Sequence, residues 1–147
     1  MDVKVFLDDG AVMPTKAYKT DAGFDLYTPV SVILPEAYIK DGNPHAGVVS
    51  IDTGVHMSIP EGYCGLLVSK SGLNVKYNIQ STGLIDSGYT GSIVAKLYNM
   101  SDRPYLFNAG DKISQIVLLP IPDVNLVEVD VLEDTDRSNN GFGSSGR

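Results

Sequence analysis

The chain has 147 residues, the size of one ordinary domain built around a single core. Its net charge of −7 excludes the broad basic face that neutralises a nucleic-acid backbone, so we expect no direct nucleic-acid binding. The first residues carry no signal-peptide pattern, and no run reaches the roughly 20 apolar residues that span a bilayer. We therefore expect a cytoplasmic protein with no membrane contact. Cys64 is the only cysteine, which excludes an intramolecular disulfide.

Short runs rich in β-branched and aromatic residues recur along the chain and predict strands. In chain order they cover residues 3–7, 30–34, 48–51, 55–59, 65–69, 93–98, 113–119 and 126–132. Residues 40–44 have the composition of a surface loop, and one short helix is expected near residues 71–77. The pattern predicts an all-β fold, a single-domain jelly-roll-like β-sandwich or barrel, over residues 1–132. Residues 133–147 have little apolar content and predict a mobile C-terminal arm.

Five segments combine polar residues with glycines that a plain strand or hairpin does not need. They are residues 22–28, 69–74, 83–91, 110–116 and 137–146. In the second, Ser71 and Gly72 open the predicted helix directly after a strand, which favours an anion site at their N–H groups. Lys70 just before them favours phosphate, although Ser71 could instead be a simple helix N-cap. Because Lys70 follows Ser69 and not glycine, the segment is not a P-loop.

The third segment places Asp86 in a predicted hairpin turn, after two apolar residues and before Ser87 and Gly88. An Asp in a turn has an ordinary conformational explanation. The alternative is a general base positioned over a water molecule by the hairpin. Tyr89 could then offer its ring as a platform.

The tail contains glycines at 141, 143 and 146, which match a dinucleotide-binding fingerprint only by letter, because no βαβ unit surrounds them. Interpreted as a flap, the tail supplies backbone N–H groups and two hydroxyls. Arg137 could bind phosphate, and Phe142 could cover an aromatic base.

In this order and at these separations, the five segments resemble the five signature motifs of the trimeric dUTPase family, from about residue 22 to residue 146. The resemblance implies a homotrimer whose active sites are shared between subunits. It also implies Mg²⁺-dependent hydrolysis of dUTP to dUMP and pyrophosphate. This activity limits uracil incorporation into DNA and supplies dUMP.

The resemblance carries specific roles onto this chain. Asp25 matches the residue that helps to position hydrated Mg²⁺ on the triphosphate, and Asp86 matches the residue that binds the 3′-hydroxyl and activates the attacking water. Tyr89 packs under the deoxyribose. The phosphates are bound by Lys70, Ser71, Gly72 and Gln115, and the uracil edge is read by the backbone of Gly83, Leu84 and Ile85. The arm that closes from a neighbouring subunit contains Arg137, Gly141, Phe142, Gly143 and Ser144, and Phe142 stacks on uracil.

The chain departs from the family pattern at several positions. Lys70 replaces the usual Arg, and an ammonium group lacks the planar two-pronged contact of a guanidinium. Gly88 and Thr90 also differ from the usual residues, as do residues 138–140 at the start of the arm. Gln80 stands where many relatives carry an Asn near the base, and it is a further candidate substrate contact.

Two other functions are considered. A dCTP deaminase has the same fold but needs a Glu general base on the strand after the hairpin, where this chain has Lys96. A nucleotide-dependent regulatory binding protein would use the arm closed on dUTP to contact a protein partner, as some viral members of the family do. A jelly roll alone could also be a capsid or carbohydrate-binding module, but such a module gives no reason for Asp86, Tyr89 and Phe142 together.

Overall fold

The structure is a computed structural model that describes residues 1–135. The described part contains twelve strands and one helix. Their bounds are β1 (Lys4–Leu7), β2 (Phe24–Tyr27), β3 (Val32–Leu34), β4 (Tyr38–Lys40), β5 (Asn43–His45), β6 (Gly47–Asp52), β7 (Val55–Ser58), β8 (Tyr63–Val68), α1 (Ser71–Tyr77), β9 (Ile79–Ile85), β10 (Val94–Asn99), β11 (Tyr105–Phe107) and β12 (Lys112–Pro120).

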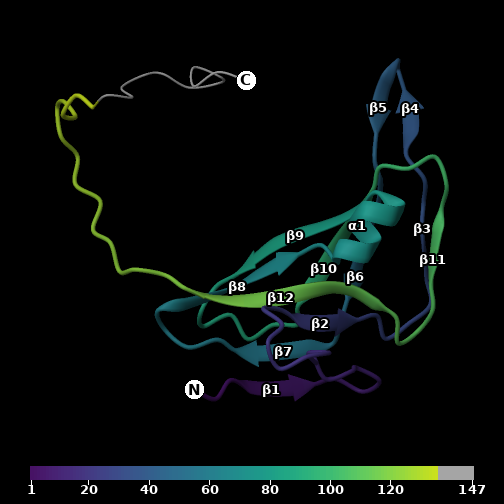
Figure 1. The fold of residues 1–147 in the computed structure, drawn as a ribbon, viewed down its shortest axis with the longest axis horizontal. Helices are drawn as coiled ribbons and strands as arrows, with labels where there is room; N and C mark the ends of the chain where they lie inside the picture. The colour runs from purple at the N-terminus through teal and green to yellow at the C-terminus, as the bar shows by residue number, and fades with distance from the viewer. Residues whose placement is uncertain (136–147) are drawn as a thin grey trace.

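The strands form one large antiparallel sheet and three strand pairs. The large sheet has the order β2-β12-β8-β9-β10-β6, and the pairs are β1-β7, β11-β3 and β4-β5. Figure 1 shows the β1-β7 pair along one side of the large sheet and the β4-β5 hairpin projecting from the opposite end. The arrangement confirms the predicted all-β, jelly-roll-like fold with one short helix.

Two apolar clusters fill the interior of the molecule. One is centred on Leu26, Leu67 and Ile116 and is covered by side chains of the β1-β7 pair. The other surrounds Leu97 and Phe107, both at most 1% exposed. The first cluster contains side chains from β2, β12, β8 and β9, which are consecutive in the large sheet, so it stabilises their packing against the β1-β7 pair. Six of the predicted site residues lie on three of these strands: Asp25 on β2, Gln80, Gly83, Leu84 and Ile85 on β9, and Gln115 on β12.

The helix begins at Ser71, as expected, but its cap differs from the simple alternative. Lys70 is the N-cap residue, with an extended backbone and no capping side-chain hydrogen bond, and Ser71 is the first helical residue. The idea that Ser71 is only an N-cap is therefore wrong. The helix ends at Tyr77, and the left-handed conformation of the C-cap residue Asn78 lets its N–H donate to the Asn74 carbonyl. Among residues 1–135, no helix is long and apolar enough to cross a membrane.

The predicted strand at residues 126–132 is not present. The last strand ends at Pro120, and the following segment runs away from the sheets (Figure 1). Val127, Val129 and Val131 alternate with Glu128 and Asp130, which is the pattern of a half-buried strand. All of these side chains are exposed. A strand needs a neighbour for its backbone hydrogen bonds, and this segment pairs with no other strand among residues 1–135.

Candidate active site

Three strands bring the first group of predicted site residues together at one end of the large sheet. Asp25 on β2 lies opposite Gln115 on β12, and Gln115 lies opposite Val68 at the end of β8. Lys70, Ser71 and Gly72 follow directly after β8. The sequence predicted that these residues bind one triphosphate, and in the fold they are neighbours.

Asp25 is the electrostatic centre of this group. Its side chain is only 6% exposed, and its carboxylate forms ion pairs with Lys70 and Lys112. The Lys112 ammonium lies 2.7 Å from Oδ2, while Lys70 contacts Oδ1. Burial of the carboxylate favours its neutral form, but hydrogen bonds and attraction from the two lysines outweigh burial and lower the pKa of Asp25. The group therefore carries two cations and one anion, a net positive balance that suits phosphate.

Lys112 was not among the predicted site residues. It lies in the predicted segment 110–116, but nothing in the spacing indicates that its side chain reaches Asp25. The register between β12 and β2 shifts between Lys112 and Ser114, so an irregularity in the strand re-aims the lysine. The register of a bulged strand pair cannot be read from composition, which is why the residue was missed.

A network of hydroxyl and amide groups holds the end of β8 in place. Gln115 Nε2 donates to the Ser69 carbonyl at 3.0 Å, and the Ser81 N–H donates to Ser69 Oγ at 2.9 Å. The hydroxyl groups of Ser81 and Ser114, both buried, lie 3.0 Å apart. One of the two Gln115 amide hydrogens is used by Ser69, which leaves the other as a donor for a ligand.

The second group of predicted residues lies where β9 runs into its connection to β10. Asp86 and Tyr89 border a hollow of about 210 Å³, which is also lined by Leu84, Ile85, Ser92 and Val94. Gly88 has a φ of 82°, which favours glycine there. The Tyr89 hydroxyl donates to the Ser92 carbonyl at 3.1 Å.

The backbone of β9 is open on one side beside this hollow. β10 pairs with β9 only at Ile79–Ser81, so its pairing stops before Gly83. On the other side, residues 82–85 pair with β8. Peptide groups of residues 83–85 that point away from β8 thus have no β10 partner. Gln80 lies opposite Tyr98 within the paired part of β9, and its side chain is exposed.

The two groups are not adjacent within one copy of the chain. Asp25, Gln115, Val68 and Thr82 form one row across the sheet. Asp86 lies four residues further along β9 from Thr82, a distance of about 13 Å at the usual rise of an extended strand. A single copy therefore presents the phosphate-binding group and the Asp86 hairpin at separate places.

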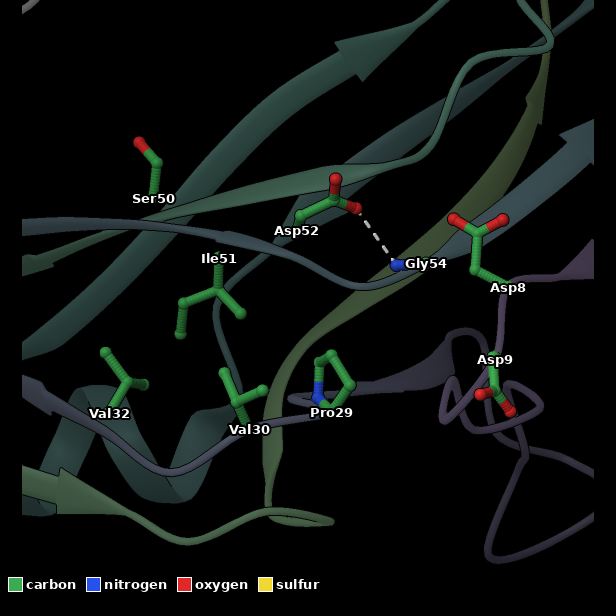
Figure 2. Close-up of a pocket in the computed structure, with 9 residues that line it drawn as sticks. All are labelled: Asp8, Asp9, Pro29, Val30, Val32, Ser50, Ile51, Asp52 and Gly54. Carbon is green, nitrogen blue, oxygen red and sulfur yellow. Dashed lines mark hydrogen bonds between the residues drawn. The ribbon is translucent and has the colours of Figure 1, made fainter.

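A different hollow, of about 370 Å³, contains three carboxylates, from Asp8, Asp9 and Asp52 (Figure 2). Asp52 already accepts hydrogen bonds from the Gly54 N–H at 3.0 Å and from the Ser92 hydroxyl, which lower its pKa, the Ser92 bond most strongly. Within residues 1–135 no group of three or more His, Cys, Asp or Glu side chains is arranged to hold a metal ion.

The remaining predicted site residues lie outside the described part of the chain. These are Arg137, Gly141, Phe142, Gly143 and Ser144. Their predicted roles in covering the nucleotide stay predictions.

Known proteins resemble this chain over most of its length. The sequence matches the dUTPase family over residues 9–146. A deoxyuridine 5′-triphosphate nucleotidohydrolase from Gloeobacter violaceus is 38% identical over 137 residues, which cover 91% of this chain and 88% of the relative. Another from Wolbachia pipientis is 39% identical, covering 96% of this chain and 92% of the relative.

Solved structures show the same similarity. The dUTPase of Staphylococcus bacteriophage 80alpha, bound to dUPNHPP, superposes with a TM-score of 0.86 at 31% identity, covering 99% of both chains. A dUTPase variant from phage phi11 of S. aureus, whose structure contains a structural Mg(II) ion, has a TM-score of 0.77 at 30% identity, covering 91% of this chain and all of that one. The chain belongs to the dUTPase family.

Proposed function

We propose that this chain hydrolyses dUTP to dUMP and pyrophosphate. The observation that carries the proposal is the cationic group around Asp25, formed by Lys70 and Lys112 beside Gln115, in a chain that also presents the Asp86 hairpin. Relatives that share more than a third of its residues are named as nucleotidohydrolases of deoxyuridine triphosphate. Removal of dUTP would limit uracil incorporation into DNA and supply dUMP.

In the proposed reaction, Asp86 accepts a proton from a water molecule while the water oxygen attacks the α-phosphorus. A bond forms between this oxygen and the α-phosphorus, and the bond from the α-phosphorus to its bridging oxygen breaks. Pyrophosphate leaves with the electron pair of that bond. Lys70, Gln115 and the first N–H groups of α1 are placed to stabilise the negative charge on the phosphates.

The residues present fit Mg²⁺ as an ion carried by the substrate. Mg²⁺ is usually held by one or two carboxylates together with substrate phosphates and several waters. Asp25 supplies one carboxylate, and both of its oxygens already contact lysines, which suits a contact through water more than direct coordination. When bound, Mg²⁺ would neutralise charge on the triphosphate.

The open edge of β9 offers a basis for selecting uracil. Peptide groups of residues 83–85 without a β10 partner can hydrogen-bond the edge of a base. Cytosine presents an inverted donor pattern at C4, so the same groups would be left unpaired, which gives strong discrimination. Tyr89 beside Asp86 is placed to pack under the deoxyribose and leave no room for a ribose 2′-hydroxyl. Phe142 of the arm would cover the base.

The homotrimer with shared sites that the family resemblance implies is supported by two features of a single copy. The separation of about 13 Å between the row of Asp25 and Asp86 is bridged if the hairpin of one subunit faces the phosphate-binding group of another. The exposed alternating segment around Val129 also needs a neighbouring strand or groove, which a second copy would supply. We therefore place each active site between subunits.

A regulatory role is a second candidate. The 80alpha phage dUTPase, to which this chain is similar, is described as controlling the transfer of virulence genes by a proto-oncogenic G protein-like mechanism. A protein partner for this chain would be compatible with catalysis. Deamination of dCTP is disfavoured, because the matching position on β10 is Lys96, whose ammonium lies over the Tyr98 ring.

The test is pyrophosphate release from dUTP, dCTP, dTTP and UTP, each with Mg²⁺ and with EDTA. We expect release from dUTP to exceed that from the other three by at least about 100-fold, because mismatched buried polar groups give large discrimination. We also expect EDTA to suppress it. Ammonia release from dCTP, or no reaction with dUTP, would overturn the proposal.

A further inference from the structure

His56 connects the Asp86 hairpin to the rest of the fold. It lies on β7 opposite Phe6 of β1. Its Nδ1 atom is 2.8 Å from the Thr90 carbonyl oxygen, and its Nε2 atom is 3.1 Å from Asp8 Oδ2. Thr90 directly follows Tyr89 in the connection between β9 and β10. The imidazole ring therefore joins a carboxylate on one side to the active-site connection on the other.

The chemistry of these two contacts depends on the charge of the ring. A carbonyl oxygen and a carboxylate oxygen both accept hydrogen bonds and cannot donate them. Only the protonated imidazolium has an N–H on both nitrogens and can satisfy both partners. A neutral ring has one N–H, which the anionic carboxylate attracts more strongly than the neutral carbonyl. The Nδ1 lone pair would then face the Thr90 oxygen, and the contact would become repulsive.

We propose that His56 is a positioning residue, whose protonated ring holds the connection that carries Asp86 and Tyr89 and whose deprotonation releases it at Thr90. The inference rests on the proposed function, because it assigns a role toward dUTP through Tyr89. His56 itself does not touch the substrate site.

The hydrogen bonds that hold the other end of this connection do not depend on the protonation of a histidine. Its far end is held by Thr53 Oγ1, which donates to the Ile93 carbonyl at 2.7 Å, and by Ser92, which donates to Asp52. Thr53 and Ser92 are neutral donors. Among residues 1–135, His56 is therefore the titratable side chain that contacts the part of the connection next to Tyr89.

The charged groups around His56 set the direction of its pH response. Asp8 faces Nε2, Asp52 attracts the ring from the end of β6, and Lys4 on β1 borders the same hollow. The hydrogen bond to Thr90, followed by that to Asp8, raises the pKa of His56. For a group with a raised pKa, the stabilising contact is complete below the unfolded value of about 6.5 and is lost as the pH rises through the folded value.

The expected consequence is a pH-dependent KM for dUTP. Tyr89 is placed to pack against the sugar, so loosening of the connection weakens binding more than it slows the chemical step. Loss of a charge-assisted hydrogen bond should raise KM by roughly 3- to 10-fold between about pH 6 and pH 9. The protonation of the triphosphate also changes over this range and contributes to the pH dependence of KM. Comparison of wild type with the variants at each pH removes that contribution.

The experiment compares full-length wild type with His56→Ala, His56→Asn and His45→Ala across this pH range. Asn keeps a neutral donor near the Nδ1 position and should hold Thr90 at every pH. We expect His56→Ala to raise KM at low pH and to converge with wild type at high pH, with kcat changed less than about twofold. We expect His56→Asn to abolish the pH dependence relative to wild type. The control, His45→Ala, removes the ring stacked on Tyr38 in the distant β4-β5 hairpin and should leave the profile unchanged.

A second measurement does not depend on catalysis. The chain has only two histidines, so NMR titration of wild type and His45→Ala assigns the His56 signal. The Thr90 amide signal should shift with the same pKa in wild type and should not titrate in His56→Ala. A KM ratio between His56→Ala and wild type that is constant with pH, or a Thr90 signal that does not follow His56, overturns the inference. If pyrophosphate is released at no pH, the result counts against the proposed function. The NMR result still decides the role of His56 in that case.

Discussion

Asp86→Asn should reduce pyrophosphate release from dUTP by about 10²- to 10⁴-fold, the usual contribution of a positioned general base. Asn has nearly the same shape as Asp but cannot accept the proton of the attacking water. Asp86 lies beside Gly88 at the mouth of a hollow and outside both apolar clusters, so the fold should not change. The variant should still bind a non-hydrolysable dUTP analogue.

The matched control for this prediction is Asp41→Asn. Asp41 occupies the turn of the distant β4-β5 hairpin with a φ of 51°, a conformation that Asn also tolerates. Steady-state kinetics and calorimetric titration with the analogue would be measured for both variants. Full activity of Asp86→Asn would contradict the role of Asp86 as the general base, and loss of analogue binding together with activity would show that the variant is inactive because it no longer binds the nucleotide.

Val129→Asp should dissociate the proposed trimer and abolish activity with it. Val127, Val129 and Val131 share one face of an extended segment, and burial of each in a neighbour would contribute roughly 1.5 kcal/mol or more. A charge at the central position opposes that burial. Because each proposed site combines two subunits, a separated chain would carry the phosphate-binding group and the Asp86 hairpin at separate places and would have no complete site.

The comparison for Val129→Asp is Glu128→Gln, which changes the opposite face of the same segment. Light scattering coupled to gel filtration would give the mass at micromolar concentration, and activity would be measured on the same samples. We expect Glu128→Gln to behave as wild type. A Val129→Asp protein that remains assembled and active would show that this face is not an interface.

The local sequence was sufficient for the fold class, and its motifs singled out Asp25, Lys70 and Gln115, which the fold brings together. β-branched runs predicted β1, β6 and β12, and the glycine after Ser71 marked the start of α1. β9 was missed because the inward positions between Ile79 and Ile85 hold the buried Ser81 and the half-buried Gly83, which interrupt the apolar pattern. The buried Ser81 hydroxyl is paired with Ser114, so polarity at that position is satisfied inside the fold and not by solvent.

Other features depend on tertiary register, which the sequence does not carry. The pairing of Lys112 with Asp25 requires the irregular register of β12 on β2, and the contact of His56 with Thr90 joins residues far apart in the chain. The β4-β5 hairpin could have been predicted, because Asp41 and Gly42 form a turn that strongly favours hairpins. The strand pattern at residues 126–132 was recognised, but residues 1–135 contain no strand that pairs with it, and we propose that a second copy of the chain does so.

The central claim is that a dUTP-hydrolysing site is assembled from two copies of this chain, and mixing two inactive variants tests it most directly. Asp86→Asn keeps the phosphate-binding group, while a Lys70→Ala and Gln115→Ala double variant keeps the hairpin. After dissociation and joint reassembly in equal amounts, random assortment should restore about one quarter of the wild-type sites, because a complete site needs one subunit of each kind. The predicted result is that pyrophosphate release returns to that level. Differently tagged chains would demonstrate that mixed trimers have formed. If they have, a mixture as inactive as its parents would contradict the shared site.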